Sequence, residues 1–233
     1  MSSGILYIVA TPIGNLGDIT YRAVETLKNV DLIACEDTRH SRVLLSHYGI
    51  EKPLTSYFDF SEKIRAPQII HQIKNGSKVA LISDAGTPGI ADPGYRLIAE
   101  AIKEGVTIEK LPGPAAFLSA LVLSGLPTDR FIFEGFFPVK PGQKKSRILE
   151  LKNETRTVIF YESPHRFLKT LDTIQEALGD VDVVVVRELT KKFEEVVRNK
   201  VSEVIKHFSR KKILGEFVIL WSAKKRGGLK DME

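Results

Sequence analysis

The chain has 233 residues, of which 43% are hydrophobic, and its 34 Lys and Arg outnumber its 29 Asp and Glu by five. This length allows one large or two modest domains with a real core. We expect no signal peptide, membrane-spanning segment, disulfide framework or cysteine-based metal cluster, because the start is neither basic nor apolar, every apolar run is short and Cys35 is the only cysteine.

The first half of the chain alternates apolar, β-branched runs with amphipathic runs. Strands are predicted at 5–10, 31–35, 79–82 and 106–111, and helices at 21–29, 36–48, 62–75, 96–103 and 115–123. Strands that alternate with helices in this way predict a parallel, doubly wound α/β sheet.

One long turn separates the strand at 79–82 from the helix at 96–103 and reads Ser83-Asp-Ala-Gly-Thr-Pro-Gly-Ile-Ala-Asp-Pro-Gly-Tyr95. Its Gly, Pro and Asp residues favour a bent, stiff backbone with open N–H groups, and Asp92-Pro93 is typical of a helix N-cap. Open α/β sheets bind ligands at the carboxyl ends of their strands, so we expect a ligand here. A connection without a ligand is the simpler alternative.

The pattern changes after Leu126-Pro127, which predicts an N-terminal α/β domain at 1–126, a second α/β domain at 127–223 and a disordered basic tail at 224–233. In the second domain we expect strands at 130–136, 156–161, 181–187 and 216–221, a short one at 193–199, and helices at 142–152, 165–178 and 201–208.

The second half of the chain is also the basic half. Residues 116–233 hold 22 Lys and Arg against 16 Asp and Glu. A basic face favours a polyanion such as RNA, although an ordinary solvated surface with excess lysine fits equally well. The residues expected to contact RNA are Lys140, Lys144, Lys145, Arg147 and Arg166.

Five unusual turns, each after a predicted strand, lie at 11–18, 36–39, 84–88, 112–116 and 162–166. Each alone also fits a structural role; for example, Glu36 and Asp37 could simply offset a helix dipole. Together they predict a large cleft lined by backbone groups, small side chains and a few charges. The sequence lacks the phosphate-binding loop, the dinucleotide-binding glycine pattern and the nucleophile elbow, which argues against those three familiar sites.

These turns resemble the signature blocks of a known family. The segments Thr11-Pro-Ile-Gly-Asn-Leu-Gly-Asp-Ile19, Glu36-Asp-Thr-Arg39, Ser83-Asp-Ala-Gly-Thr-Pro-Gly-Ile90, Leu111-Pro-Gly-Pro-Ala115 and Tyr161-Glu-Ser-Pro-His-Arg166 are similar to those of the tetrapyrrole-methylase-like class of S-adenosylmethionine (SAM) methyltransferases. The wider class has GxGxGD in the first loop and Gly-Asp-Pro in the third. The departure from both resembles the ribosomal RNA branch and argues against a corrin, uroporphyrinogen or diphthamide substrate.

The resemblance implies two α/β domains with SAM in the cleft between them, a homodimer, a cytoplasmic location and no metal or membrane. It implies 2′-O-methylation of a cytidine ribose in the decoding region of 16S rRNA, either free or in the assembled small subunit. The residues expected to contact SAM are Pro12, Asp84, Gly86, Thr87, Ile90, Asp92, Pro112, Gly113, Ala115 and Ala116, with Phe160, Tyr161, Glu188, Glu216 and Phe217 from the second domain.

Methyl transfer to a ribose hydroxyl needs two reactants held in line, and a base that accepts the hydroxyl proton helps further. Candidates for this base are Glu36, Asp37, Asp18, Glu162 and His165, and the sequence does not choose among them. Arg39 and Arg166 are candidates for orienting a phosphate or the acceptor ribose.

Two other functions stay open from the residues. One is a small-molecule methyltransferase of the same class, against which the basic stretch at 137–169 counts. The other is a non-catalytic RNA-binding module, against which the loop cleft counts, since such a module needs no cofactor site. A titration with SAM distinguishes the RNA-binding module from the two methyltransferases. Methylation of purified small subunits, compared with naked rRNA, distinguishes the RNA methyltransferase from the small-molecule methyltransferase.

Overall fold

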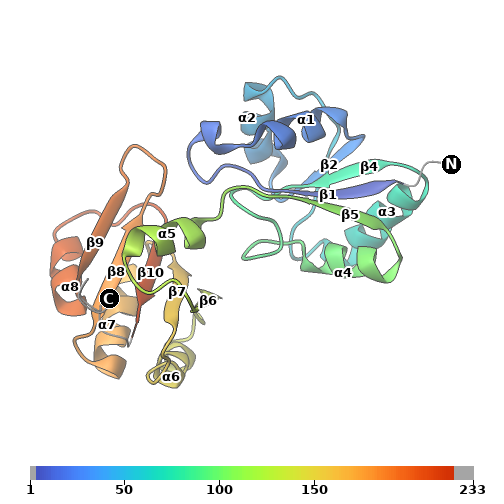
Figure 1. Ribbon diagram of the computed structural model, residues 1–233. Helices are drawn as coiled ribbons and strands as arrows, with labels where there is room; N and C mark the ends of the chain where they lie inside the picture. The colour runs from blue at the N-terminus through green and yellow to red at the C-terminus, as the bar shows by residue number, and fades with distance from the viewer. Residues whose placement is uncertain (1–3, 223–233) are drawn as a thin grey trace, which may run out of the picture. The chain divides into compact units, whose positions relative to one another are not determined.

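The computed structural model describes residues 4–222, and the predicted tail at 224–233 lies outside them. The chain divides into two compact units, residues 1–115 and 116–233 (Figure 1). Within the described residues, no helix is both long and apolar enough to cross a membrane.

The first unit is built on a five-stranded parallel sheet with the strand order β3-β2-β4-β1-β5. Its elements are β1 (Ile5–Val9), the 3-10 helix η1 (Leu16–Asp18), α1 (Tyr21–Asn29), β2 (Leu32–Cys35), α2 (Thr38–His47), β3 (Leu54–Ser56), α3 (Glu62–Lys74), β4 (Lys78–Leu81), α4 (Tyr95–Lys103) and β5 (Thr107–Leu111). The predicted parallel, doubly wound sheet is confirmed. The short elements β3 and η1 were not predicted.

Helices cover both faces of this sheet (Figure 1). On one face, side chains of α3 and α4 such as Ile70 and Leu97 pack on Leu6 and Leu81 of the strands. On the other face, α1 and α2 pack on a second cluster that includes Leu27 and Ile33. Strands buried on both faces read as continuous apolar runs, which is why β1, β2 and β4 were visible in the sequence. The edge strand β5 is less apolar and carries Glu109 and Lys110.

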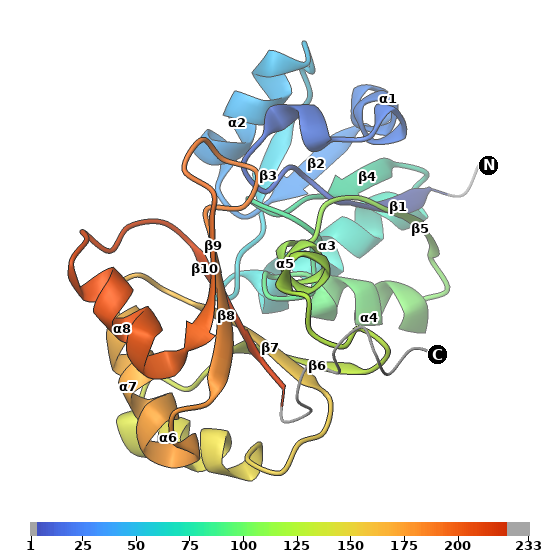
Figure 2. The ribbon, with the colours of Figure 1, turned by 60° about the vertical axis from the view of Figure 1, so that its left-hand side comes forward.

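The second unit is built on a five-stranded mixed sheet with the order β6-β7-β10-β8-β9. Its elements are α5 (Ala116–Ser124), β6 (Phe131–Phe136), α6 (Pro141–Glu150), β7 (Thr157–Glu162), α7 (Phe167–Leu178), β8 (Asp182–Arg187), β9 (Glu195–Lys200), α8 (Val201–Ser209) and β10 (Phe217–Trp221). Only β6 and β7 pair in parallel, and the other neighbours are antiparallel. Figure 2 shows α6, α7 and α8 on one face of this sheet and α5 on the other.

The boundary between the units falls earlier than the predicted one at 126–127. Helix α5 contacts β7, β8, β9 and β10, and therefore belongs to the second unit. The Arg198 guanidinium of β9 donates hydrogen bonds to the carbonyl oxygens of Leu123 and Ser124 at the end of α5. Because α5 is apolar around most of its circumference, it needs a sheet face to cover it, and the second sheet provides one.

Candidate functional site at the edge of the first sheet

The carboxyl ends of β1, β4 and β5 lead into three turns that are tied together. The Thr11 N–H donates to the Gly86 carbonyl oxygen at 2.9 Å, and the Gly86 N–H donates back to Thr11 at 3.0 Å. The Thr87 hydroxyl donates to the Pro114 carbonyl oxygen at 3.2 Å. The predicted gathering of turns at one sheet edge is therefore present within the first unit for the segments around 11, 86 and 114.

Two glycines allow the backbones of these turns to approach closely. Gly86 has φ of +84°, a conformation that residues with a side chain rarely adopt. A Cβ atom at Gly113 would lie 2.7 Å from the Ala10 Cβ, so only glycine lets the turn after β5 lie directly against the end of β1. Gly86 is buried among these turns, whereas Gly113 is exposed at the edge.

A group of carboxylates lies beside these turns. Glu36 directly follows β2 and is half-buried. Burial raises the pKa of its carboxyl to about 7, and the nearby carboxylates of Asp92, Asp84, Asp59 and Asp37 contribute to this rise. A carboxyl with this pKa exchanges protons readily near neutral pH. The structure thus brings together four predicted site residues and adds Asp59.

Asp37 and Arg39 are engaged with each other. The Asp37 carboxylate accepts hydrogen bonds from the Arg39 backbone N–H at 2.8 Å and from the Arg39 guanidinium at 3.1 and 3.3 Å. These bonds lower the pKa of Asp37, which caps the N-terminus of α2. Asp37 is therefore a weaker base than Glu36. Arg39 stays 88% exposed at the same edge.

Three residues near this edge were not predicted. Asp59 follows β3, the strand that the sequence did not reveal. Glu62 accepts a hydrogen bond from the Gly94 N–H at 3.0 Å and pairs with Arg96, and the Tyr57 hydroxyl accepts one from the Leu97 N–H at 3.1 Å. Glu62 and Tyr57 therefore hold the start of α4, where the turn at 84–94 ends. A buried glutamate at a helix start carries no distinctive sequence signal.

The turn after β7 in the second unit differs from the prediction. Glu162 has a fully buried side chain, and its carboxylate binds Lys144 at 3.1 Å, Arg166 at 2.8 Å and the Thr170 hydroxyl at 2.6 Å. Each of these two side chains is buried against the other, which argues against the predicted roles of Glu162 as a base and of Lys144 as an RNA contact. His165 lies exposed in the same turn.

The remaining predicted RNA contacts lie on or near α6. Lys145 pairs with Glu176 at 3.0 Å, and Arg147 makes two bonds of 2.9 Å to Glu134. Lys140 is exposed just before the helix. Since acidic partners neutralise much of this stretch, it is a less basic surface than its composition indicates.

The predicted SAM contacts of the second unit separate into core and surface residues. Phe160 packs on Phe137 and Trp221, and Phe217 stacks on Phe167 at 4.1 Å between ring centres. Both are buried core side chains, which argues against their predicted contact with SAM. Tyr161 points to the other face of the sheet, where its hydroxyl accepts a hydrogen bond from the Phe117 N–H. Glu188 and Glu216 both bind Lys191.

The other predicted SAM contacts differ in how exposed they are. Ala115 and Ala116 are half-buried, Pro12 is buried, and Ile90 and Pro112 are exposed.

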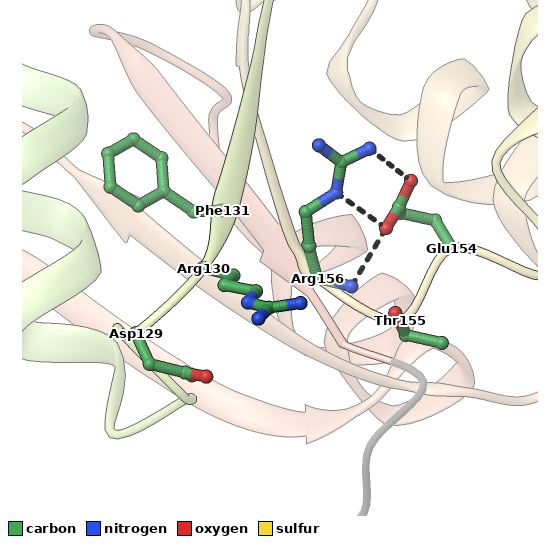
Figure 3. Close-up of a pocket in the computed structure, with 6 residues that line it drawn as sticks. All are labelled: Asp129, Arg130, Phe131, Glu154, Thr155 and Arg156. Atoms are coloured by element: carbon green, nitrogen blue, oxygen red, sulfur yellow. Dashed lines mark hydrogen bonds and ion pairs between the residues drawn. The ribbon is translucent and has the colours of Figure 1, made fainter.

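A cavity of about 610 Å³ lies at the opposite end of β6 and β7 from Tyr161 (Figure 3). It is lined by Asp129, Arg130, Phe131, Glu154, Thr155 and Arg156. The Arg156 guanidinium is bound by Glu154, with two bonds of 2.8 Å. The cavity contains no predicted site residue. Among residues 4–222, no group of three or more His, Cys, Asp or Glu side chains could hold a metal ion.

Comparison with known proteins identifies the relatives of this chain. Residues 5–205 match the family of tetrapyrrole (corrin/porphyrin) methylases. Ribosomal RNA small subunit methyltransferase I of Thermotoga maritima is 50% identical over 95% of this chain and 99% of its own length, and that of Haemophilus influenzae is 50% identical over 87% and 72%. Among solved structures, a diphthine synthase (TM-score 0.75, 15% identity, 94% of this chain and 90% of that one) and a cobalt precorrin-4 methyltransferase (0.67, 21%, 94% of each) share the fold.

Proposed function

Because this chain belongs to the tetrapyrrole methylase family, and within it to the ribosomal RNA small subunit methyltransferase I group, we propose that it methylates the 2′-hydroxyl of a cytidine ribose in the decoding region of 16S rRNA. The chain is a methyltransferase, and SAM is the proposed methyl donor. We further propose that the protein is a homodimer, that it works in the cytoplasm, and that its substrate is free 16S rRNA or the assembled small subunit.

The edge of the first sheet fits SAM by its chemistry. Gly113 is exposed and carries no side chain, so main-chain groups of the turn after β5 would be accessible to the adenosine or the amino-acid end of SAM. Carboxylates such as Asp84 and Asp92 favour a sulfonium cation. When bound, SAM supplies an activated methyl group on sulfur. The chain's part is to hold donor and acceptor in line and to exclude water.

The observation that carries the proposal is the Glu36 carboxyl with its pKa of about 7 beside the joined turns. A general base works best when its pKa lies near the operating pH. Glu36 would accept the proton of the ribose hydroxyl as the oxygen takes the methyl group. Arg39, exposed at the same edge, would bind a neighbouring phosphate of the RNA.

Purified protein should bind one SAM per chain in a calorimetric titration, with and without a chelator. It should then transfer methyl to purified small subunits or 16S rRNA, and mass spectrometry of the nucleosides should find the methyl on a cytidine ribose. Absence of binding heat would contradict the SAM site. Binding without methyl transfer to RNA, but with transfer to a porphyrinoid, would favour the small-molecule alternative.

Gly113→Ala should weaken SAM binding by at least about tenfold. The added Cβ would lie 2.7 Å from the Ala10 Cβ, so the turn after β5 must shift away from β1 at an overpacking cost of about 1–3 kcal/mol. Calorimetry measures the affinity, and a melting curve measures the stability. Gly142→Ala, at an open position in α6, is the matched control; it should leave SAM affinity unchanged and should not lower the stability. Wild-type affinity in a stably folded Gly113→Ala variant would place SAM elsewhere.

A further inference from the structure

The loop between β8 and β9 contains two residues with a strained backbone. Glu188 and Thr190 have φ of 53° and 65°, a region that non-glycine residues rarely occupy. Strained residues persist only where surrounding contacts fix them, and they gather at functional sites. Figure 1 shows this loop, in orange, reaching beyond the ends of its strands.

Several bonds compensate for the strain. The Lys191 ammonium binds Glu188 at 2.9 Å and Glu216 at 2.8 Å, and so joins the loop to the start of β10. The Thr190 N–H donates to the Glu194 carboxylate at 2.7 Å, and Leu189 is buried beneath the loop. These contacts use the inner residues of the loop and leave its tip outside.

The tip presents one aromatic ring and one cation to solvent. Phe193 is 68% exposed, and the Lys192 ammonium lies 5.8 Å from the centre of its ring. A ring fixed at a loop tip beside a cation is available for a planar ligand to stack on.

The surroundings indicate which partner fits. Residues 187–212 hold nine Lys and Arg against four Glu. Carboxylates pair with Lys191, Lys200, Lys206 and Lys211, and the Arg198 guanidinium binds α5, so Lys192 at the tip is the cation that matters most here. Further along β9, a cavity of about 310 Å³ is lined by Val197, Asn199, Glu203, Lys206, His207 and Arg210. An aromatic ring beside a cation, on a strand that continues toward more cations, matches single-stranded nucleic acid, whose bases stack on rings and whose phosphates bind Lys and Arg.

We propose that the loop at 188–194 is an RNA-binding finger, in which an unpaired base stacks on Phe193 and the adjoining backbone follows Lys192 and the cations of β9 and α8. This inference rests on the proposed function, since it assumes an RNA substrate. It assigns RNA contacts to the tip of the β8–β9 hairpin, outside the stretch at 137–169.

The test is a binding titration of the full chain with a fluorescent, unstructured RNA of about 16 nucleotides at several salt concentrations. Phe193→Ala should weaken binding at least about fivefold without changing the salt slope, because stacking releases no counterions. Lys192→Ala should reduce that slope by about 0.7, and Phe193→Trp should bind at least as well as wild type. Leu149→Ala, which removes an exposed apolar side chain from α6, is the control and should have no effect.

The inference and the proposed function fail in different ways. Unchanged RNA affinity in Phe193→Ala, or a wild-type protein that does not bind the RNA, would overturn the finger. A change of molecular mass in light scattering on Phe193→Ala would also overturn it, because the tip would then contact a second copy. If Phe193→Ala binds RNA like the wild type, the finger is overturned and the SAM titration is unaffected. If the finger binds RNA but the protein transfers no methyl group, the proposed function alone is overturned.

Discussion

Glu36→Gln should lower single-turnover methylation of the ribosomal substrate by roughly 100- to 10,000-fold, the usual contribution of a general base. Glutamine keeps the size and polarity of the side chain but cannot accept the hydroxyl proton. SAM affinity should change little, since the turns that would hold SAM remain intact. The loss should therefore appear in the rate of methyl transfer measured at saturating SAM and RNA.

The same substitution should make the protein more stable at alkaline pH. The pKa of Glu36 is about 7 in the folded protein against an ordinary value of 4.5, so the folded state binds more protons between these values. The free energy of unfolding then falls as the pH rises from about 4.5 to about 7. A glutamine at this position carries no such penalty. After allowance for solvent screening of this half-exposed group, we expect a gain of about 1 kcal/mol at pH 8 and none at pH 4.

Asp59→Asn is the matched control for this interpretation. It removes one of the carboxylates that raise the pKa of Glu36 and leaves the base in place. The wild-type rate should rise with pH through about 7 and then level off, and Asp59→Asn should move this rise to lower pH. A Glu36→Gln variant that methylates at the wild-type rate would show that Glu36 has no role as base, and His165 would become the next residue to test.

Sequence reasoning located the central strands of the first sheet, β1, β2 and β4, well because they read as nearly unbroken apolar runs. It missed β3, since Leu54-Thr-Ser56 is short, half-buried and partly polar. The second sheet was harder. Its last strand, β10, lies between β7 and β8. The sequence of Phe217–Trp221 predicts a strand but does not indicate which strands pair with it.

The turns of the site were predictable because parallel strands end at one edge, whereas burial of individual side chains was not. Neighbouring residues of a strand point to opposite faces, so Phe160 and Tyr161 could not both face one ligand. Lys144 and Glu162 are 18 residues apart and look like surface charges until the fold joins them. Pairing across the fold therefore makes this face less basic than the sequence indicates.

That pairing leads to the second large effect, which concerns stability. Lys144→Ala should lower the free energy of unfolding by about 3 kcal/mol or more, because it leaves the Glu162 carboxylate buried with Arg166 as its remaining cation. The cavity left by the aliphatic part of Lys144 adds to the loss. Chemical denaturation measures the change. Lys145→Ala, which breaks an exposed pair one residue away, should cost less than about 1 kcal/mol.

A second variant separates the buried charge from the lost packing. Glu162→Gln combined with Lys144→Met removes the buried pair and keeps most of the length of the lysine side chain. The Arg166 guanidinium loses its carboxylate in this variant but is 23% exposed to water. The variant should therefore recover much of the stability lost in Lys144→Ala, since replacing a whole buried pair is often nearly neutral. RNA affinity of this double variant should match the wild type, because neither side chain reaches the surface. If Lys144→Ala instead keeps its stability and loses RNA affinity, Lys144 leaves its buried position to meet the RNA, and the network with Glu162 is an RNA-binding site after all.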